Sequence, residues 1–364
     1  MIPPVQREGN RRMQPRYALT DTESGHVWGV CAEAAGLFRE PPRATYKLFG
    51  WVPGGTEVRG WVGDRVWLVP EDRTLDAWRL KDAESLGRRP GADSLVLTGL
   101  DDHLGPPDGH RAPVRLHDEY RWLGSCREFT RVLPPEREER PLVLRGLAPS
   151  DRLRRTLATG TRRARDLGEA SLEIRDDRGA PLTDRLLHAE VRSWQPSSHG
   201  TGLIDLEVDG HVAPVPGHAG PVWERWLTGP PEASGAWTAL DTRLRGVWLD
   251  LVRERGCRLR HHDRRAGHAY ELDGRHITDR PGLYLALGEA VNGPGGYFGG
   301  NLDAVVDCLR GGFGHTAPAT LLWRHAATAR AHLSRVLTPE GGQRDLVALT
   351  AEVLAEGGMR VTFG

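Results

Sequence analysis

The 364-residue sequence predicts a multi-domain α+β protein, in which a β-rich N-terminal region precedes a C-terminal α/β domain with a small three-stranded parallel sheet. The length exceeds that of an ordinary single domain. Up to about residue 220, short apolar stretches with partial alternation are separated by Gly, Pro and Asp, a pattern typical of strands. After about residue 270, strand-like stretches alternate with helical ones, which indicates an α/β unit.

The composition limits the classes of function. Lys and Arg together number 49, as do Asp and Glu, so the formal net charge is zero. That balance argues against a general binder of nucleic acid or anionic membranes, which would carry a basic excess. No apolar run is long enough for a membrane helix. The four cysteines, Cys31, Cys126, Cys257 and Cys308, form no CxxC pair, so we expect neither a metal site nor a disulfide framework.

The composition of residues 1–16 predicts a disordered leader. They are basic but contain no apolar stretch of the kind that a secretory signal needs. We therefore expect a cytoplasmic protein, and reduced cysteines fit that compartment.

Residues 17–150 predict a β-rich region with a weak internal echo. Both 26–38 and 120–133 carry Trp and Gly-x-Cys, and a strand ending in Gly follows each about twenty residues later. Either two related β modules or a chance similarity could explain this internal similarity. The polar, Pro-rich stretches 101–113 and 133–141 predict linkers.

Residues 151–265 predict a mixed β/α region. A short helix is expected at 221–227, and 240–255 repeats apolar residues at helical spacing. Gly256 is expected to end that helix. Residues 257–269 are basic, polar and aperiodic, and they mark the last domain boundary.

Residues 269–364 predict the C-terminal α/β domain. Thr278 or Asp279 can cap a helix at 279–292, and Asn301 is well placed to cap a helix at 302–310. The remaining expected elements are strands at 270–277, 319–326 and 359–363 and helices at 327–337 and 343–358.

Asp303 and Asp307 stand one turn apart on the expected helix 302–310, with no basic residue directly beside them in the sequence. Like charges at this spacing destabilise a helix by about 0.2–0.5 kcal/mol. Both lie off the apolar stripe of Leu302, Val305, Val306 and Leu309, which we expect to face the core. A solvated helix face and a binding surface both remain open on this pattern alone.

The stretch around these acids resembles the barstar family, intracellular inhibitors of the ribonuclease barnase. The matching residues are Tyr297-Phe298-Gly299-Gly300-Asn301-Leu302-Asp303-Ala304, then Asp307-Cys308-Leu309 and Gly311. The order of expected elements over 269–364 is also similar. The resemblance implies a barstar-like fold for this domain and a small, basic, barnase-like ribonuclease as its partner, with no cofactor and no direct contact with nucleic acid or membrane.

The resemblance also implies partner-binding residues. Tyr297 would pack on the nuclease from the loop before the helix, and Asn301 lies in the same matching stretch. Asp303 would face the guanine-site side of the nuclease, and Asp307 would enter its phosphate pocket. The other implied contacts are the backbone at Gly311, Glu352 against a basic rim, and the more peripheral Glu356.

Several positions depart from the family's founding member, among them the region of Gly357, Gly358 and Met359, where its second cysteine is absent. Val306 and Gly312 stand where it carries aromatic residues, and Gly300 where it carries an acid. Aromatic anchors often carry much of the binding energy at an interface. These departures leave the identity of the nuclease and the affinity open.

Other stretches give weaker indications. The glycine-rich loop 293–301 lacks the Lys-Ser/Thr of a phosphate-binding loop. Residues 260–263 with His268 allow a metal site, but in a polar linker they are more typical of solvated side chains. The basic stretch 154–166 fits a solvated helix face or a site for an acidic partner. No catalytic set has a recognisable spacing before residue 265, so we expect no enzyme there.

The sequence therefore predicts a proteinaceous inhibitor of a barnase-like ribonuclease that acts as an immunity or regulatory protein. The alternative is a non-inhibitory interaction module of the same fold, with the main role carried by the N-terminal region. An enzymatic N-terminal region is a third and weaker alternative.

Overall fold

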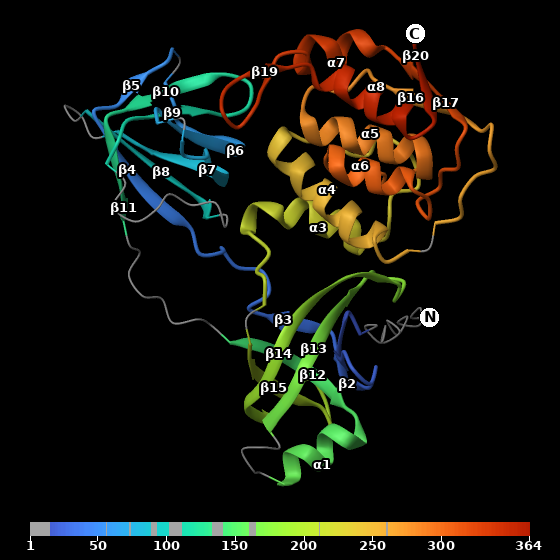
Figure 1. The fold of residues 1–364 in the computed structure, drawn as a ribbon. Helices are drawn as coiled ribbons and strands as arrows, with labels where there is room; N and C mark the ends of the chain where they lie inside the picture. Colours follow the sequence, from blue (N-terminus) through green and yellow to red (C-terminus); the bar gives the residue numbers. More distant parts are fainter. Residues whose placement is uncertain are drawn as a thin grey trace, which may run out of the picture. The chain divides into compact units, whose positions relative to one another are not determined.

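The computed structural model describes residues 15–55, 57–72, 74–88, 93–101, 111–132, 141–159, 165–210, 212–259 and 261–364 (Figure 1). Nearly all of the predicted leader, and most of both predicted linkers, lie outside these residues. The chain divides into two compact units, one of residues 1–40 with 139–229 and one of 41–138 with 230–364. The segments expected from the sequence, 17–150 and 151–265, are each continuous, whereas each unit combines two separate stretches.

The first unit contains a closed antiparallel barrel of six strands. The strand order is β15-β14-β13-β1-β2-β12, and β12 pairs back to β15, while the short β3 extends from β12. Closure leaves the six strands without free edges. The strands are β1 Tyr17–Asp21, β2 Val27–Cys31, β3 Glu33–Ala35, β12 Leu142–Pro149, β13 Asp166–Arg175, β14 Pro181–Pro196 and β15 Ile204–Asp209. The helical elements of this unit are α1 Asp151–Thr159, the 3-10 turn Gly217–Ala219 and α3 Gly220–Leu227.

The β-rich part of the second unit, residues 41–132, is called the inserted β-domain because its sequence separates the two halves of the first unit. Its eight strands have the order β11-β4-β8-β7-β6-β9-β10-β5. They enclose an apolar core that includes Tyr46, Trp51 and Trp78. The strands are β4 Ala44–Phe49, β5 Val52–Pro53, β6 Gly60–Pro70, β7 Trp78–Gly87, β8 Ser94–Asp101, β9 Val114–His117, β10 Trp122–Cys126 and β11 Glu128–Val132.

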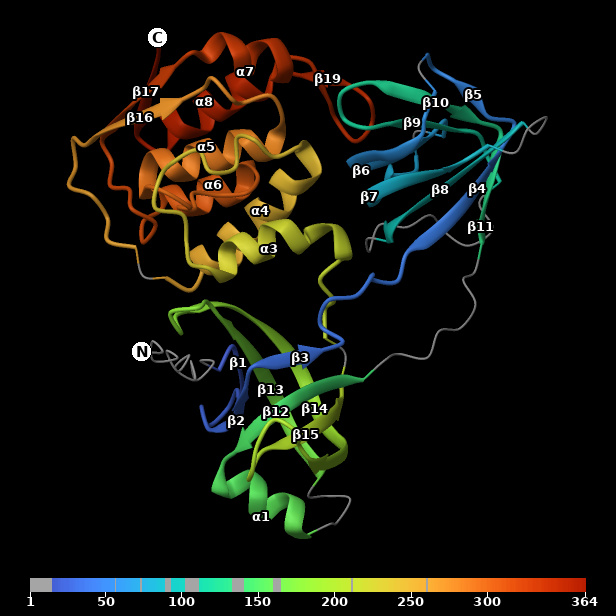
Figure 2. The same ribbon diagram turned by 180° about the vertical axis from the view of Figure 1, so that it is seen from behind.

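The C-terminal domain is built on a parallel sheet of three strands in the order β16-β17-β20, as the sequence predicts. The strands are β16 Ala269–Asp273, β17 Ala319–Arg324 and β20 Met359–Phe363. The helices are α5 Arg280–Asn292, α6 Leu302–Leu309, α7 Ala326–Leu333 and α8 Leu346–Glu356, with a small hairpin of β18 Val336–Leu337 and β19 Gln343–Arg344 (Figure 2). None of the described helices has the length and apolar character needed to cross a membrane.

Several elements are shorter than the sequence suggests, including β17, which ends at Arg324, and α8, which begins at Leu346 and ends at Glu356. The strand expected at 270–277 stops at Asp273, because Gly274 begins a turn that leads to the cap of α5. The helix expected at 327–337 ends at Leu333, and Val336–Leu337 pairs instead with Gln343–Arg344. Asp279 caps α5 through its side chain, which accepts a hydrogen bond from Gly282 N.

The internal echo does not correspond to two modules. In the first copy, Trp28–Cys31 lies in the six-stranded barrel, whereas the strand that follows, β4, lies in the inserted β-domain. In the second copy the assignment is reversed, since β10 lies in the inserted β-domain and β12 in the barrel. Neither copy is therefore a compact structural unit.

Helix α4, Thr242–Gly256, precedes the C-terminal domain and is fixed at its first turn. The Arg243 guanidinium donates two hydrogen bonds to the Asp82 carboxylate of the inserted β-domain, at 2.6 and 2.7 Å. Arg245 Nη1 donates to Asp279 at 2.9 Å, so the cap of α5 also holds α4. α4 packs against both α5 and β6, which brings its C-terminal end to the loop before α6.

Candidate functional site

Helix α6 is a short helix whose start is set by its own sequence. Asn301 Oδ1 accepts a hydrogen bond from Ala304 N at 2.8 Å, which is the predicted cap. The helix ends at Leu309, and Gly311 follows with a φ of +109°, a conformation that glycine adopts without strain. Val305 and Cys308 are its fully buried residues, so the predicted stripe is only partly correct. Burial raises the pKa of the Cys308 thiol to about 12, which keeps it protonated at neutral pH.

Asp303 and Asp307 are exposed on α6. Asp303 forms no ion pair with any residue that the structure describes. Asp307 pairs with Arg310 Nη1 at 2.8 Å, so the expectation that both carboxylates lack a basic partner is wrong for Asp307. The reason is local: Arg310 lies three residues along the same helical turn. The two side chains are 66% and 73% exposed, and such pairs contribute about 0–1 kcal/mol, which a partner's guanidinium can replace.

The acids of α8 extend this exposed carboxylate set. Glu352 and Glu356 are exposed on α8, and α8 packs against α6. The packing is close at the end of α8, where a Cβ on Gly357 would lie 2.6 Å from Leu309 Cδ1. The four acids Asp303, Asp307, Glu352 and Glu356 therefore stand on two neighbouring helices, which Figure 1 shows at the C-terminal domain. We call these four residues the acidic set.

Tyr297 has a role that the sequence does not suggest. The residue is only 5% exposed, although the resemblance implies that it packs on a partner. It lies against Gly256 at the end of α4, where an added Cβ would approach Tyr297 Cβ to 2.4 Å. It also meets Phe313 edge-on, with ring centroids 6.0 Å apart. Burial raises the pKa of the Tyr297 phenol. In this structure Tyr297 is a packing residue of the loop before α6.

The loops on either side of α6 are joined by residues that sequence reasoning missed. Asn292 Nδ2 donates to the carbonyl oxygens of Tyr297 and Phe313, at 2.7 and 2.9 Å. The Asp263 carboxylate accepts hydrogen bonds from Gly312 N and Gly314 N. Asp263 lies in the stretch interpreted as a polar linker, and only its contact with residues about fifty positions later gives it a role. Gly311 is half-buried beside it.

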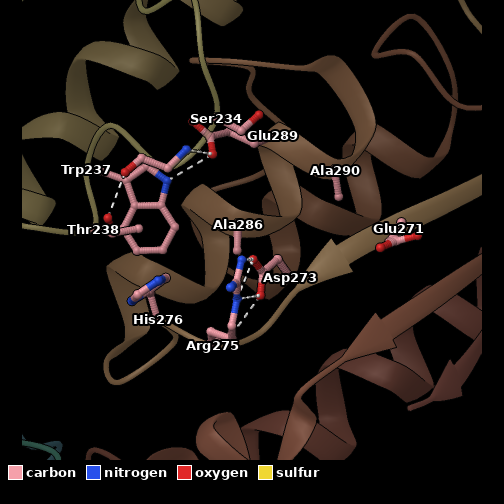
Figure 3. A pocket seen from close by; sticks show the side chains of 11 residues that line it. Ser234, Trp237, Thr238, Glu271, Asp273, Arg275, His276, Ala286, Glu289 and Ala290 are labelled. Atoms are coloured by element: carbon pink, nitrogen blue, oxygen red, sulfur yellow. Dashed lines mark hydrogen bonds and ion pairs between the residues drawn. The ribbon is translucent and has the colours of Figure 1, made fainter.

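A pocket of about 270 Å³ opens between α5, β16 and the loop before α4 (Figure 3). The Glu289 carboxylate accepts hydrogen bonds from Gly235 N at 2.7 Å and Trp237 Nε1 at 3.1 Å. Arg275 donates to both oxygens of Asp273, so these charges neutralise each other. Burial raises the pKa of Glu289. Glu289, Arg275 and Asp273 in this pocket already form hydrogen bonds within the protein. This argues that they have a structural role and do not bind a ligand.

No group of three or more His, Cys, Asp or Glu side chains that could hold a metal ion occurs among the described residues. His268, considered above with residues 260–263, instead packs edge-on against Tyr270, with ring centroids 4.6 Å apart. Among the described residues near α6, the groups available to bind a partner are therefore exposed carboxylates.

The C-terminal domain is similar to a known family. Residues 267–338 match the family described as Barstar (barnase inhibitor). The matched segment includes β16, α5, α6, β17, α7 and the first strand of the hairpin, whereas α4 and the acids of α8 lie outside it. No curated protein matches the chain.

Proposed function

Because its C-terminal domain belongs to the barstar (barnase inhibitor) family, we propose that the protein inhibits a barnase-like ribonuclease by inserting the acids of α6 into the cationic active site. The observation that carries the proposal is a capped, exposed helix that presents Asp303 and Asp307 within the family-matched segment. In this proposal the chain acts as a binding protein, without cofactor or catalysis. It acts in the cytoplasm as an immunity or regulatory protein.

The chemistry of a ribonuclease explains why carboxylates would suffice. Such an enzyme presents cationic groups to the phosphodiester that it cleaves. A carboxylate at that position mimics the phosphate and accepts charge-assisted hydrogen bonds from arginine. Asp303 is unpaired within the described chain, and the partner of Asp307 is an exposed arginine of the same turn. Binding would therefore remove little internal stabilisation, and exposed negative charge would speed the encounter at low salt.

The buried position of Tyr297 changes the expected contact surface. Its ring is covered by the end of α4 and by Phe313, so it offers little area to a partner. Together with the replaced aromatic residues at Val306 and Gly312, this favours an interface that depends on the acidic set. Glu352 and Glu356 on α8 would then contact the basic rim of the nuclease.

The experiment measures inhibition of barnase-class ribonucleases by the full chain. We expect inhibition by the unaltered protein and a loss of at least about a hundredfold in affinity for Asp307→Ala, because the substitution leaves nuclease cations buried and unpaired. Glu23→Ala is the matched control, since Glu23 is an exposed acid of the barrel unit. Inhibition unchanged in the double variant Asp303→Ala/Asp307→Ala, or absent with every nuclease of the class, would remove the proposal.

A second candidate is a non-inhibitory interaction module. The burial of Tyr297 favours it, because the aromatic contact implied by the family resemblance is not available on the surface. The main role would then lie with the six-stranded barrel or the inserted β-domain. A gene for a small secreted ribonuclease beside the gene for this protein would support inhibition. Capture of partners whose binding is unchanged by Asp307→Ala would support the non-inhibitory interaction module.

A further inference from the structure

Three residues that precede the family-matched segment contact both loops that flank α6. They are Gly256, His261 and Asp263, and we call them the brace. Gly256 contacts Tyr297 in the loop before α6. His261 stacks on Phe313 in the loop after α6, with ring centroids 5.7 Å apart and an angle of 27° between the planes. His261 Nε2 donates to Gly256 O at 2.9 Å, which joins the two contacts.

Asp263 makes the polar part of the brace. Its Oδ2 accepts from Gly312 N at 2.8 Å, and its Oδ1 accepts from Gly314 N at 2.9 Å. Gly311, Gly312 and Gly314 have φ values of +109°, +81° and +89°. Backbone N–H groups in turns of this kind converge on a concave site that attracts anions. The chain's own carboxylate fills that site, so the loop conformation depends on Asp263.

Asn292 adds further contacts to the same two loops that the brace contacts. Asn292 Nδ2 donates to Tyr297 O and Phe313 O, and the rings of Tyr297 and Phe313 lie edge to face. Both ends of α6 are therefore held, one by the buried Tyr297 and the other by the Asp263 carboxylate. Asp307 and its partner Arg310 lie at the end of α6 that Asp263 holds.

We propose that Asp263 is a positioning residue that holds the glycine loop 311–314, and with it the Asp307 end of α6, in the geometry that binds the nuclease. This inference rests on the proposed function. A loop that is ordered before binding loses less conformational entropy in the complex. The brace thus replaces, by preorganisation, part of the affinity that the missing aromatic anchors would supply. It also predicts that residues 269–364 alone bind more weakly than the full chain.

The first arm of the test needs no nuclease. Hydrogen–deuterium exchange of the full chain is measured for peptides that cover 310–316, in the unaltered protein, Asp263→Ala and the control Glu23→Ala. We expect the amides of Gly312 and Gly314 to exchange at least about tenfold faster in Asp263→Ala, because their acceptor is lost. Exchange at the control rate in this loop would overturn the proposal that Asp263 holds it.

The second arm measures association and dissociation rates with a nuclease that the full chain inhibits. We expect Asp263→Ala to weaken binding about tenfold, mainly through faster dissociation, since the contacts of Asp307 become less well ordered. Asp263→Asn keeps an oxygen that can accept from Gly312 N and Gly314 N, so it is expected to restore most of the affinity. Unchanged affinity in Asp263→Ala, or no rescue by Asp263→Asn, would overturn the positioning role.

The two arms separate this inference from the proposed function. If no nuclease binds the unaltered chain, the proposed function fails, and the exchange arm still decides whether Asp263 holds the loop. If Asp307→Ala weakens binding and Asp263→Ala does not, the proposed function stands and the positioning role fails. Circular dichroism melting of each variant checks that the fold is retained.

Discussion

The inserted β-domain and the C-terminal domain use the same residue type in opposite ways. Asp82 of the inserted β-domain is buried, and its carboxylate accepts hydrogen bonds from Arg43, Trp61 and Arg243. Asp303 and Asp307 of the C-terminal domain are exposed, and their one ion pair within the described chain is with a neighbouring arginine. A buried carboxylate must find its partners inside the protein. An exposed one can keep its binding capacity for another molecule.

This difference in burial distinguishes acidic residues that stabilise the fold from acidic residues that are free to bind another molecule. Asp82 adopts a φ of +46° and joins two distant stretches of the chain, so its environment depends on the tertiary structure. The acids of α6 depend on a helix that is capped within three residues of its start. Substitutions at the two kinds of site should therefore affect different measurements.

The largest effect on stability is expected for Asp82→Ala. The substitution leaves the partly buried Arg43 without its carboxylate, whereas Arg243 keeps its ion pair with Glu84 at 2.9 Å. Breaking a buried pair costs about 3–5 kcal/mol, and the remaining Glu84 pair offsets part of that loss. Urea unfolding of the full chain measures the change. Asp82→Asn, which keeps two hydrogen-bond acceptor sites on one oxygen, should lose less. A loss below about 1 kcal/mol for Asp82→Ala would show that the cluster is not structurally important.

A smaller effect on stability is expected for Asp307→Ala than for Asp82→Ala. The lost ion pair with Arg310 is exposed and contributes at most about 1 kcal/mol, and removal of a like charge near Asp303 partly offsets the loss. Urea unfolding should therefore place this variant within about 1 kcal/mol of the unaltered protein. If the variant is as unstable as Asp82→Ala, Asp307 belongs to the structural class of acids and its proposed role is weakened.

The smallest effect concerns pH and His117, a buried residue of the inserted β-domain. His117 Nε2 donates to Pro339 O at 3.2 Å and Nδ1 accepts from Glu119 N at 3.2 Å, so the ring is neutral when both bonds form. Burial lowers its pKa below the usual 6.5. The unfolded chain therefore binds a proton first as pH falls, and stability decreases below about pH 6.5.

The matched variant for this prediction is His117→Gln, which cannot take up a proton in this range. Unfolding free energies measured at several values between about pH 5 and 7 should rise less steeply with pH in the variant than in the unaltered protein. A variant with an equal or steeper slope would contradict the assignment of a lowered pKa to His117.

The sequence predicted best those features that depend on neighbouring residues. The caps at Asp279 and Asn301 and the position of the α6 acids outside the apolar stripe follow from side chains within a few positions of one another. The three parallel strands follow from the alternation of strand-like and helical stretches along the sequence. The pair of Asp307 with Arg310 is equally local, and the i,i+3 spacing was the signal that could have predicted it. The ends of β16 and α7 were less accurate, because turns and a hairpin compete there with the regular elements.

The surroundings of the candidate site and the organisation of the N-terminal half depend on contacts between distant parts of the chain. The barrel closes through β12 and β15, and its two parts are separated by the whole inserted β-domain. Tyr297 is buried by a glycine forty-one residues earlier, and Asp263 reaches amides about fifty residues later. Local sequence patterns encode hydrogen bonds within one helical turn or one strand pair. Contacts across longer separations depend on how the elements pack, so they became visible only once the chain was folded.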